Sequence, residues 1–323
     1  MKVASSLHEL HRDHGLDQVA LACGVFDGVH RGHVRILEHL LSLSNETEAT
    51  PVVLTFDPHP RAILRPDNPP PFLCTITQKL DRFEHIGIKA TIILDFSPAL
   101  AALSAGQFLH DYLLNSPVDV TGICVGASWR FGTRGEGTTR FLENEGRKHN
   151  FRVVSVPELT WYGKIVSSTR IRRAIIHGEL EKAARMLGRR YAVRGQVVQG
   201  KGVGGRQLHC RTANLVASEL LLPPHGVYAA RGRQCAGSPR RRNPAFLDGI
   251  AYIGTAPTFA EQGREKRLEF HFFNRSSDLY GNEIEIEFLE FIRPDRRFPS
   301  VADLSRQMES DIATAKEVCV NAP

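Results

Sequence analysis

The chain has 323 residues, of which 42% are hydrophobic and 24% charged, and its formal net charge is +6. This length suits two domains rather than one, and the composition is typical of a soluble globular protein. No apolar run approaches the roughly 20 residues needed to span a bilayer, and the opening MKVASSLHELHRDHG lacks the apolar core of a secretory signal, so membrane and secreted classes are not expected.

The first part of the chain, up to about residue 186, alternates short apolar runs with segments of helical spacing. The runs rich in Val and Ile, which are expected to be strands, are Val19–Cys23, Pro51–Phe56, Ala90–Leu94, Gly122–Val125 and Phe151–Val156. Helical spacing occurs between them, for example over residues 34–41 and 79–86. This alternation predicts a mostly parallel, doubly wound α/β sheet, which binds ligands at the carboxyl ends of its strands.

The stretch CGVFDGVHRGH follows the first of these runs, and a helix is expected to begin near His30. The free N–H groups and positive dipole end of such a helix favour an anion. His30 and His33 share one face of the helix, where two imidazoles can donate hydrogen bonds to a phosphate. Gly24 and Gly28 would let the backbone approach a ligand. The alternative is a capped helix with surface histidines, but the combination with Asp27 favours a binding site.

The sequence pattern changes near residue 187. From there to about residue 292 the runs are short and extended, with frequent glycine, and residues 283–288 alternate Ile or Phe with Glu. This pattern predicts an antiparallel barrel or sandwich. The tail has apolar residues at spacings of three and four, which predict an amphipathic helix packed on the barrel. They are Val301, Leu304, Met308, Ile312 and Ala315.

The six cysteines form no CxxC pair. Cys23, Cys74 and Cys124 lie in or beside apolar runs and are expected to be reduced core residues. Together with the absence of a secretory signal, this predicts a cytoplasmic enzyme.

Much of the basic excess lies in two arginine clusters. They are Arg170, Arg172, Arg173, Arg185, Arg189 and Arg190, and Arg231, Arg233, Arg240, Arg241 and Arg242. Such clusters bind either nucleic acid or small polyphosphates. The chain has no zinc-ligand spacing, helix-turn-helix or RNP-like aromatic pattern, so nucleic acid is not the expected partner, and the segment 234–243 is expected to be a solvated loop. The sequence is compatible with a homo-oligomer and does not specify one.

The motif GVFDGVHRGH resembles the nucleotidyltransferase signature of the bacterial bifunctional riboflavin kinase/FAD synthetase family. Further segments similar to that family, in order along the chain, are FDPHP (56–60), VSSTRIR (166–172), LGRRYAVRGQVVQG (187–200), LLPPHGVY (221–228), IGTAPTF (253–259) and DLYGNEIEIEFLEFIRP (278–294). The resemblance covers essentially the whole chain. It implies an α/β doubly wound nucleotidyltransferase domain over residues 1–186, followed by an antiparallel β-barrel domain with a C-terminal helix over 187–323.

For the first domain, the resemblance implies transfer of AMP from ATP to FMN, which gives FAD and pyrophosphate with no covalent enzyme intermediate. His30 and His33 would be the catalytic residues. The residues implied to bind ATP and its phosphates are Gly24, Phe26, Asp27, Gly32, Ser167, Ser168, Thr169 and Arg172. Hydroxyl and guanidinium groups suit a triphosphate. The same hydroxyl residues also suit a helix N-cap, and the two roles are compatible.

One departure from the family lies in the first domain. The family usually has VGxDFRFG where this chain has VGASWRFG, so that Ser128 replaces an aspartate and Trp129 a phenylalanine. The loss of a carboxylate near the nucleotide predicts reduced or retuned adenylylation rather than none.

For the second domain, the resemblance implies a riboflavin kinase, in which the flavin 5′-hydroxyl attacks the γ-phosphorus of ATP with Mg²⁺ present. Thr212 and Asn214 would lie at the Mg²⁺ and phosphate, and Glu269 would be the base; strand alternation alone explains Glu269 equally well as a surface residue. The family's GFPTAN is replaced by HCRTAN, residues 209–214, and the preceding GKGVGGR is one residue longer than usual. Because proline fixes φ, its replacement by Arg211 changes the turn that orients the threonine.

Three functions therefore compete. The first is a bifunctional enzyme that phosphorylates riboflavin to FMN and adenylylates FMN to FAD, with Mg²⁺, with ATP as co-substrate and with FMN and FAD as substrate and product. The second is a monofunctional FAD synthetase with a degenerate, flavin-binding kinase domain. The third is a non-catalytic regulator that binds flavin or nucleic acid.

Overall fold

The computed structural model of the protein describes residues 1–67, 69–198, 212–217, 219–235, 244–255, 266–274 and 279–322. The chain divides into two compact units, the first formed by residues 1–70 and 76–167 and the second by residues 71–75 and 168–323. The helices over residues 168–187, which the sequence pattern grouped with the first domain, thus belong to the second compact unit.

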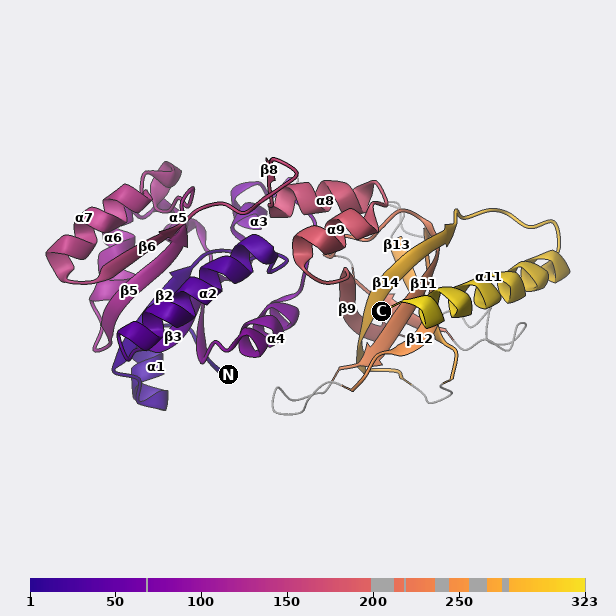
Figure 1. Cartoon of the computed structure of the whole chain (residues 1–323), viewed down its shortest axis with the longest axis horizontal. Coiled ribbons are helices and arrows are strands. Elements are labelled where there is room, and N and C mark those ends of the chain that lie inside the picture. The colour runs from indigo at the N-terminus through magenta and orange to yellow at the C-terminus, as the bar shows by residue number, and fades with distance from the viewer. Residues whose placement is uncertain are drawn as a thin grey trace. The chain divides into compact units, whose positions relative to one another are not determined.

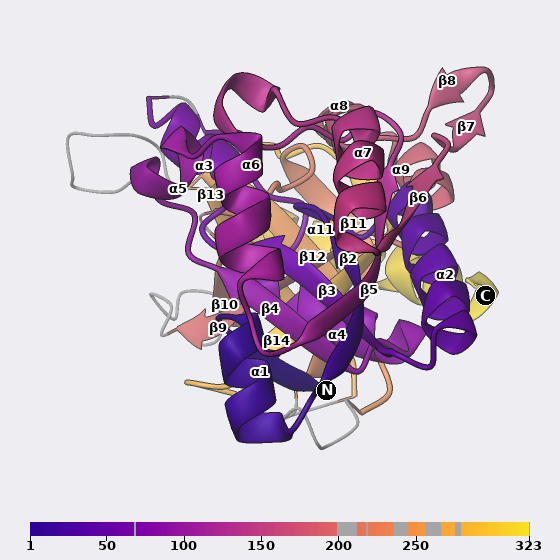
Figure 2. The same cartoon turned by 90° about the vertical axis from the view of Figure 1, so that its left-hand side faces the viewer.

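The first unit is a parallel sheet of six strands in the order β1-β4-β3-β2-β5-β6, with helices on its two sides (Figures 1 and 2). The strands are β1 (Lys2–Ala4), β2 (Gln18–Cys23), β3 (Thr50–Phe56), β4 (Ala90–Leu94), β5 (Asp119–Gly126) and β6 (Arg152–Val156). The helical segments are α1 (Leu7–His14), α2 (Arg31–Glu46), α3 (Pro60–Leu64), α4 (Ile76–Ile86), α5 (Pro98–Ala102), α6 (Ala105–Leu109), η1 (His110–Leu114), η2 (Thr133–Gly135) and α7 (Thr139–His149). A two-stranded hairpin, β7 (Thr160–Trp161) and β8 (Lys164–Ile165), follows β6.

The predicted doubly wound sheet is confirmed. Side chains alternate between the two faces of β2: Leu21 packs in a core with α1, α6 and α7, whereas Ala22 packs in a second core with α2 and α4. Such two-sided burial explains why the strands appear in the sequence as continuous apolar runs. The strand β1 was not predicted because it is only three residues long and pairs with β4 at the edge of the sheet.

The second unit contains two helices followed by a closed antiparallel barrel in the order β10-β13-β12-β11-β14-β9, which confirms the predicted barrel. Its elements are α8 (Ser168–Ile176), α9 (Leu180–Leu187), β9 (Ala192–Val198), β10 (Ala213–Val216), β11 (Gly226–Gln234), β12 (Leu247–Thr255), β13 (Lys266–Phe272), β14 (Glu283–Arg293) and α11 (Val301–Asn321). In β14, the residues Ile284, Ile286 and Phe288 are buried, as the alternation predicted.

The helix α11 is capped at its N-terminus by Ser300, whose hydroxyl accepts a hydrogen bond from the Asp303 N–H at 3.1 Å. It packs on the barrel through its C-terminal half, where Ala315 and Cys319 are buried. The N-terminal half is less buried, and Val301 is 56% exposed, so the prediction that Val301 contributes to the apolar face of this helix is wrong.

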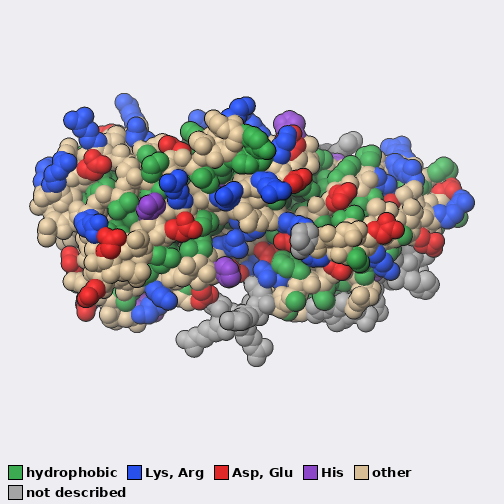
Figure 3. Space-filling view, in the orientation of Figure 1, with side chains coloured by type: hydrophobic (Ala, Val, Ile, Leu, Met, Phe, Trp, Pro, Cys, Tyr) green, Lys and Arg blue, Asp and Glu red, His purple; other side chains and the backbone are tan. Residues whose placement is uncertain are grey.

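The described arginines of the second predicted cluster are paired within the protein. Arg231 donates hydrogen bonds to the carbonyls of Cys319 and Ala322 at the C-terminal end of α11, at 2.8 and 3.1 Å. Arg233 donates two hydrogen bonds to Glu285, at 2.9 and 2.6 Å. On the face shown in Figure 3, lysines and arginines are interspersed with aspartates and glutamates. Arg231 and Arg233 therefore bind groups within the second unit.

The cysteines in the described ranges, including Cys23, Cys74 and Cys124, are free and buried, as predicted. None of the described helices combines the length and apolar character needed to cross a bilayer.

Candidate active sites

The first candidate site is the turn between β2 and α2. The chain runs from β2 outward through β3 to β4 and then returns to β5 on the other side of β2, so the carboxyl end of β2 lies at a topological switch point of the sheet. The turn is tight, because Phe26, Gly28 and Val29 have φ of 51°, 80° and 37°. A β-branched residue with positive φ stores strain of roughly 1–3 kcal/mol, which is typical of functional turns.

This turn is held by two side chains from neighbouring elements. The carbonyl of Val25 accepts hydrogen bonds from the hydroxyl of Thr55 at 3.1 Å and from the ammonium group of Lys79 at 3.0 Å. Lys79 is buried although it is charged. Sequence analysis did not find Lys79, because only the folded chain brings α4 next to this turn.

The two predicted catalytic histidines lie together at the start of α2. His30 is the N-cap, and its Nδ1 accepts a hydrogen bond from the backbone N–H of His33 at 3.3 Å. A neutral imidazole that accepts at Nδ1 carries its proton on Nε2, so that Nε2 is the donor atom of His30. The two rings are stacked, with centroids 3.6 Å apart, and the His33 ring also makes a T-shaped contact with the Phe26 ring. The prediction that a helix begins near His30 is confirmed.

The glycines of this motif make room for neighbouring side chains. A Cβ on Gly32 would lie 3.1 Å from the His30 ring, and one on Gly24 would lie 3.1 Å from the Phe26 ring. The ring of Phe26 is buried against His33 and Phe83, so any contact of Phe26 with a ligand is through its backbone. The predicted phosphate-binding residue Asp27 is buried in the same turn, with 4% of its surface exposed.

The segment VSSTRIR begins beside the same turn. A Cβ on Gly32 would also lie 3.7 Å from the carbonyl of Val166, so Ser167 follows a residue that borders the histidine motif. Ser168, Thr169 and Arg172 lie in α8 of the second unit. The guanidinium of Arg172 is buried, and its Nε donates a hydrogen bond to the Pro71 carbonyl at 2.8 Å. The roles of these residues in ATP binding stay predictions.

The departure at VGASWRFG lies just after β5. Ser128 is exposed in a turn closed by the hydrogen bond from the Trp129 N–H to the Gly126 carbonyl at 2.9 Å. The indole of Trp129 stacks on the Phe131 ring, with centroids 4.5 Å apart. Trp129 therefore contributes to packing, and Ser128 lies at the carboxyl-end edge of the sheet.

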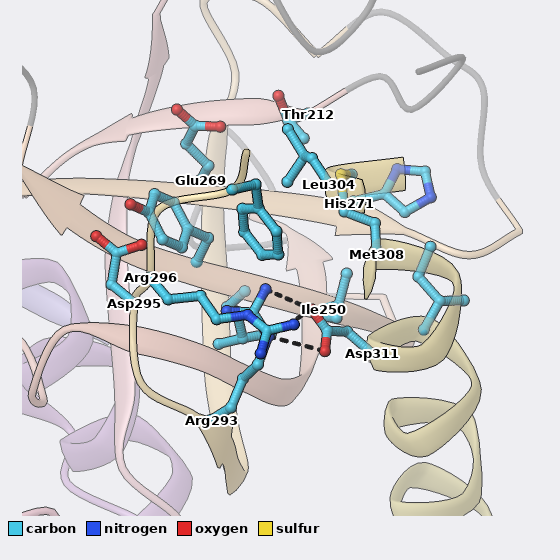
Figure 4. A pocket seen from close by; sticks show the side chains of 15 residues that line it. Thr212, Ile250, Glu269, His271, Arg293, Asp295, Arg296, Leu304, Met308 and Asp311 are labelled. Carbon is cyan, nitrogen blue, oxygen red and sulfur yellow. Dashed lines mark hydrogen bonds and ion pairs between the residues drawn. The ribbon is translucent and has the colours of Figure 1, made fainter. Parts of the chain in front are cut away.

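The second candidate site is a cavity of about 380 Å³ in the barrel unit, between the outer face of the sheet and α11 (Figure 4). The strand register aligns residues of five strands in one row across this face; they are Asn214 (β10), Glu269 (β13), Tyr252 (β12), Val227 (β11) and Arg293 (β14). All but Asn214 line the cavity, and so does Thr212, so the structure brings the predicted residues Thr212 and Glu269 to one cavity.

Figure 4 shows the carboxylates of Glu269 and Asp295 on one side of this cavity, and Leu304, Met308 and the imidazole of His271 on the other. The Glu269 carboxylate lies 3.4 Å from the guanidinium of Arg267. The cavity can therefore hold a flat apolar ring at one end and a polar chain at the other.

Asn214 has the features of a ligand for a cation. It pairs directly with Glu269 across the two strands, and 9% of its surface is exposed. Its amide oxygen is buried and accepts no hydrogen bond from any residue that the structure describes. Such an oxygen costs free energy unless a donor or a cation satisfies it.

A buried ion pair closes the floor of the cavity. The Arg293 guanidinium donates to both carboxylate oxygens of Asp311 at 2.7–2.9 Å, and Gln307 donates to the same carboxylate at 2.7 Å. This pair joins β14 to α11 and holds the helix face that carries Leu304 and Met308 over the cavity. Sequence analysis recognised that helix face only as packing, and it did not find the cavity residues Tyr252, Arg293 or Asp311.

The altered segment His209–Arg211, the glycine-rich stretch before it, residues 256–265 and Arg240–Arg242 lie outside the described residues. Their predicted roles rest on the sequence alone.

Both halves of the chain match known protein families. A family model described as FAD synthetase matches residues 13–170, and one described as riboflavin kinase matches residues 187–319. The chain is 32% identical to the bifunctional riboflavin kinase/FMN adenylyltransferase of Escherichia coli K12, with 98% of this chain and 97% of the relative covered. It is 30% identical to the protein of the same name from Buchnera aphidicola of Acyrthosiphon pisum, with 97% and 96% covered. A crystal structure of a macrolide-efflux protein from Streptococcus pneumoniae is similar, with a TM-score of 0.78 and 27% identity over 96% of each chain.

Proposed function

Because the chain belongs to the bifunctional riboflavin kinase/FMN adenylyltransferase family, and so converts riboflavin to FMN and FMN to FAD, we propose that each reaction has its own site in this chain. FMN adenylylation takes place at the turn between β2 and α2, and riboflavin phosphorylation takes place in the cavity of the barrel unit. The observation that carries this proposal is the separation of the chemically competent groups into two compact units, with the stacked histidines in one and Glu269 with Thr212 in the other.

In the adenylylation reaction, an oxygen of the FMN phosphate attacks the α-phosphorus of ATP, and the bond to the β-phosphate oxygen breaks to release pyrophosphate. The N-terminus of α2 provides N–H groups and a positive dipole end for the phosphates. His30 and His33 donate hydrogen bonds to phosphate oxygens and offset the charge that develops on them. Catalysis here is positioning and charge stabilisation, because phosphorus transfer needs no covalent group from the protein.

In the kinase reaction, the riboflavin 5′-hydroxyl attacks the γ-phosphorus of ATP, its proton passes to Glu269, and ADP leaves. Glu269 suits this role because its carboxylate faces the polar end of a cavity that is otherwise mainly apolar. The apolar end, which includes Leu304 and Met308, holds the isoalloxazine ring.

Mg²⁺ fits the donor groups that lie beside Glu269. The buried amide oxygen of Asn214 and the hydroxyl of Thr212 are oxygen ligands of the kind that Mg²⁺ accepts, together with phosphate oxygens and water. When bound, the ion would neutralise charge on the transferred phosphate. The protein itself would contribute these two ligands, and the strand register keeps Asn214 next to Glu269. We place the enzyme in the cytoplasm, where ATP is available, with riboflavin, FMN and ATP as its small-molecule partners.

Two variants test whether each reaction has its own site. His33→Ala is expected to abolish formation of FAD from FMN while riboflavin is still phosphorylated, and Glu269→Gln is expected to do the reverse. Each variant is supplied with riboflavin or with FMN, plus ATP and Mg²⁺, and the flavins are separated by chromatography. Equal loss of both activities in either variant would contradict two separate sites. A wild-type protein that makes FAD from FMN but no FMN from riboflavin would support the monofunctional alternative instead.

A further inference from the structure

The side chain of Tyr252 has no role in the reactions described above, yet it stands beside the proposed base. Tyr252 in β12 is directly opposite Glu269 in β13, and both line the cavity. Side chains that oppose each other in this way lie about 5 Å apart on one face of a sheet. Any substrate whose reacting hydroxyl lies at Glu269 therefore passes within reach of Tyr252.

The position of the tyrosine ring is fixed by the strand beneath it. A Cβ on Gly254 would lie 2.2 Å from the Tyr252 hydroxyl oxygen, so the ring lies along β12 in the space that only a glycine leaves. This packing fixes the position of the Tyr252 hydroxyl group.

The hydroxyl also has a carboxylate partner. Burial raises the pKa of Tyr252 to about 12, and the charge of Asp295 and hydrogen bonding to it add to this shift. The group therefore keeps its proton at neutral pH. Asp295 comes from the segment after β14 and lines the same end of the cavity as Glu269 (Figure 4). A phenol and a carboxylate next to each other offer one hydroxyl oxygen and further acceptor positions to a polyol chain.

We propose that Tyr252 and Asp295 form a subsite that recognises the ribityl hydroxyls of riboflavin and thereby determines specificity for the sugar-alcohol chain. The inference rests on the proposed placement of the 5′-hydroxyl at Glu269 and of the isoalloxazine ring beside Leu304 and Met308. Because Tyr252 and Asp295 lie at the same end of the cavity as Glu269, they are next to the part of the ribityl chain that carries the 5′-hydroxyl, and its secondary hydroxyls meet the phenol and the carboxylate. An apolar wall at this place would leave those hydroxyls without partners, which disfavours binding.

The test compares riboflavin with a flavin that carries a 5-hydroxypentyl chain at the same ring nitrogen, which keeps the reacting hydroxyl and lacks the others. The full-length enzyme is assayed for phosphorylation of both compounds. For Tyr252→Phe, kcat/KM for riboflavin is expected to fall about tenfold, mainly through KM, because one hydrogen bond is lost. The value for the hydroxypentyl flavin is expected to change less than about twofold. Asp295→Asn is likewise expected to lower kcat/KM for riboflavin and to change the value for the hydroxypentyl flavin little.

A matched control is Tyr228→Phe, which removes another tyrosine hydroxyl from the barrel. That hydroxyl donates to the Pro224 carbonyl at 2.6 Å and does not line the cavity. This variant is expected to lower stability and to leave the ratio of the two kcat/KM values unchanged. If Tyr252→Phe lowers kcat/KM for both flavins by the same factor, or for neither, the subsite is refuted. The placement of riboflavin phosphorylation in this cavity is not affected by that result. If Glu269→Gln still phosphorylates riboflavin, the placement of the substrate is wrong and the subsite is refuted with it.

Discussion

The ion pair between Arg293 and Asp311 is expected to contribute strongly to the stability of the barrel unit. The Asp311 side chain is 4% exposed and the Arg293 side chain 16% exposed, and three contacts of 2.7–2.9 Å join them. Removing one partner of a buried pair costs roughly 3–5 kcal/mol, because the remaining charge is left uncompensated, whereas replacing both with apolar residues is often neutral.

The two single variants are expected to differ. Arg293→Met leaves the deeply buried carboxylate with the amide of Gln307 as its remaining donor among the described residues, so a cost of about 3–5 kcal/mol is expected. Asp311→Leu leaves a guanidinium that still donates to the Pro294 carbonyl and reaches solvent, so about 1–3 kcal/mol is expected. The double variant is expected to be more stable than Arg293→Met alone.

Urea unfolding followed by far-UV circular dichroism measures these differences. Both tryptophans, Trp129 and Trp161, belong to the first unit, so tryptophan fluorescence identifies the transition of that unit and the remaining transition belongs to the barrel. KM for riboflavin is expected to rise in both single variants, because α11 carries one wall of the cavity, while adenylylation of FMN is unchanged. If the losses in the free energy of unfolding of the two single variants add up in the double variant, the two side chains do not stabilise each other as a buried ion pair.

Three further outcomes are expected. Burial raises the pKa of Glu287, although the charges of Arg190 and Arg231 act in the opposite direction. The ionised form of Glu287 therefore destabilises the folded barrel. The stability of the barrel rises as pH falls through this raised pKa, and the gain is complete below the ordinary pKa of 4.5. Glu287→Gln should therefore stabilise the barrel in urea unfolding at pH 7 and lose that advantage below about pH 4.5, and an unchanged pH profile would count against it. Ser128→Asp, which restores the family's carboxylate, is expected to raise the rate of FAD formation from FMN several-fold, with the riboflavin kinase rate as the control; no change would show that the site compensates elsewhere. The triple change His209→Gly, Cys210→Phe and Arg211→Pro is expected to raise the kinase kcat, and an unaltered kcat would mean that HCRTAN is an adapted sequence.

The sheet of the first unit and the helix start at His30 could be predicted from sequence because both are encoded locally. Each strand is a short apolar run, and the motif CGVFDGVHRGH contains its own cap and turn residues. The packing of α8 and α9 in the barrel unit could not be predicted, because their amphipathic pattern does not say which core their apolar faces meet. The resemblance, rather than periodicity, singled out Glu269, since strand alternation alone also explains a surface glutamate.

Long-range contacts are the part that sequence analysis missed. Lys79 reaches the Val25 carbonyl across more than fifty residues, and nothing near Lys79 in the sequence indicates it. Tyr252 becomes a neighbour of Glu269 only through the register of β12 and β13. The pair of Arg293 and Asp311 depends on the return of α11 onto the barrel. In each case the residue type was visible in the sequence, but its partner was set by tertiary structure.

We propose that two independent sites in this chain carry out the two reactions, and complementation in a mixture is the sharpest test of this. His33→Ala and Glu269→Gln are each incubated with riboflavin, ATP and Mg²⁺, separately and then together. Neither protein alone is expected to make FAD, and the mixture is expected to make it, because FMN released by His33→Ala is adenylylated by Glu269→Gln. A mixture that yields no FAD, while the wild type does, would contradict the claim.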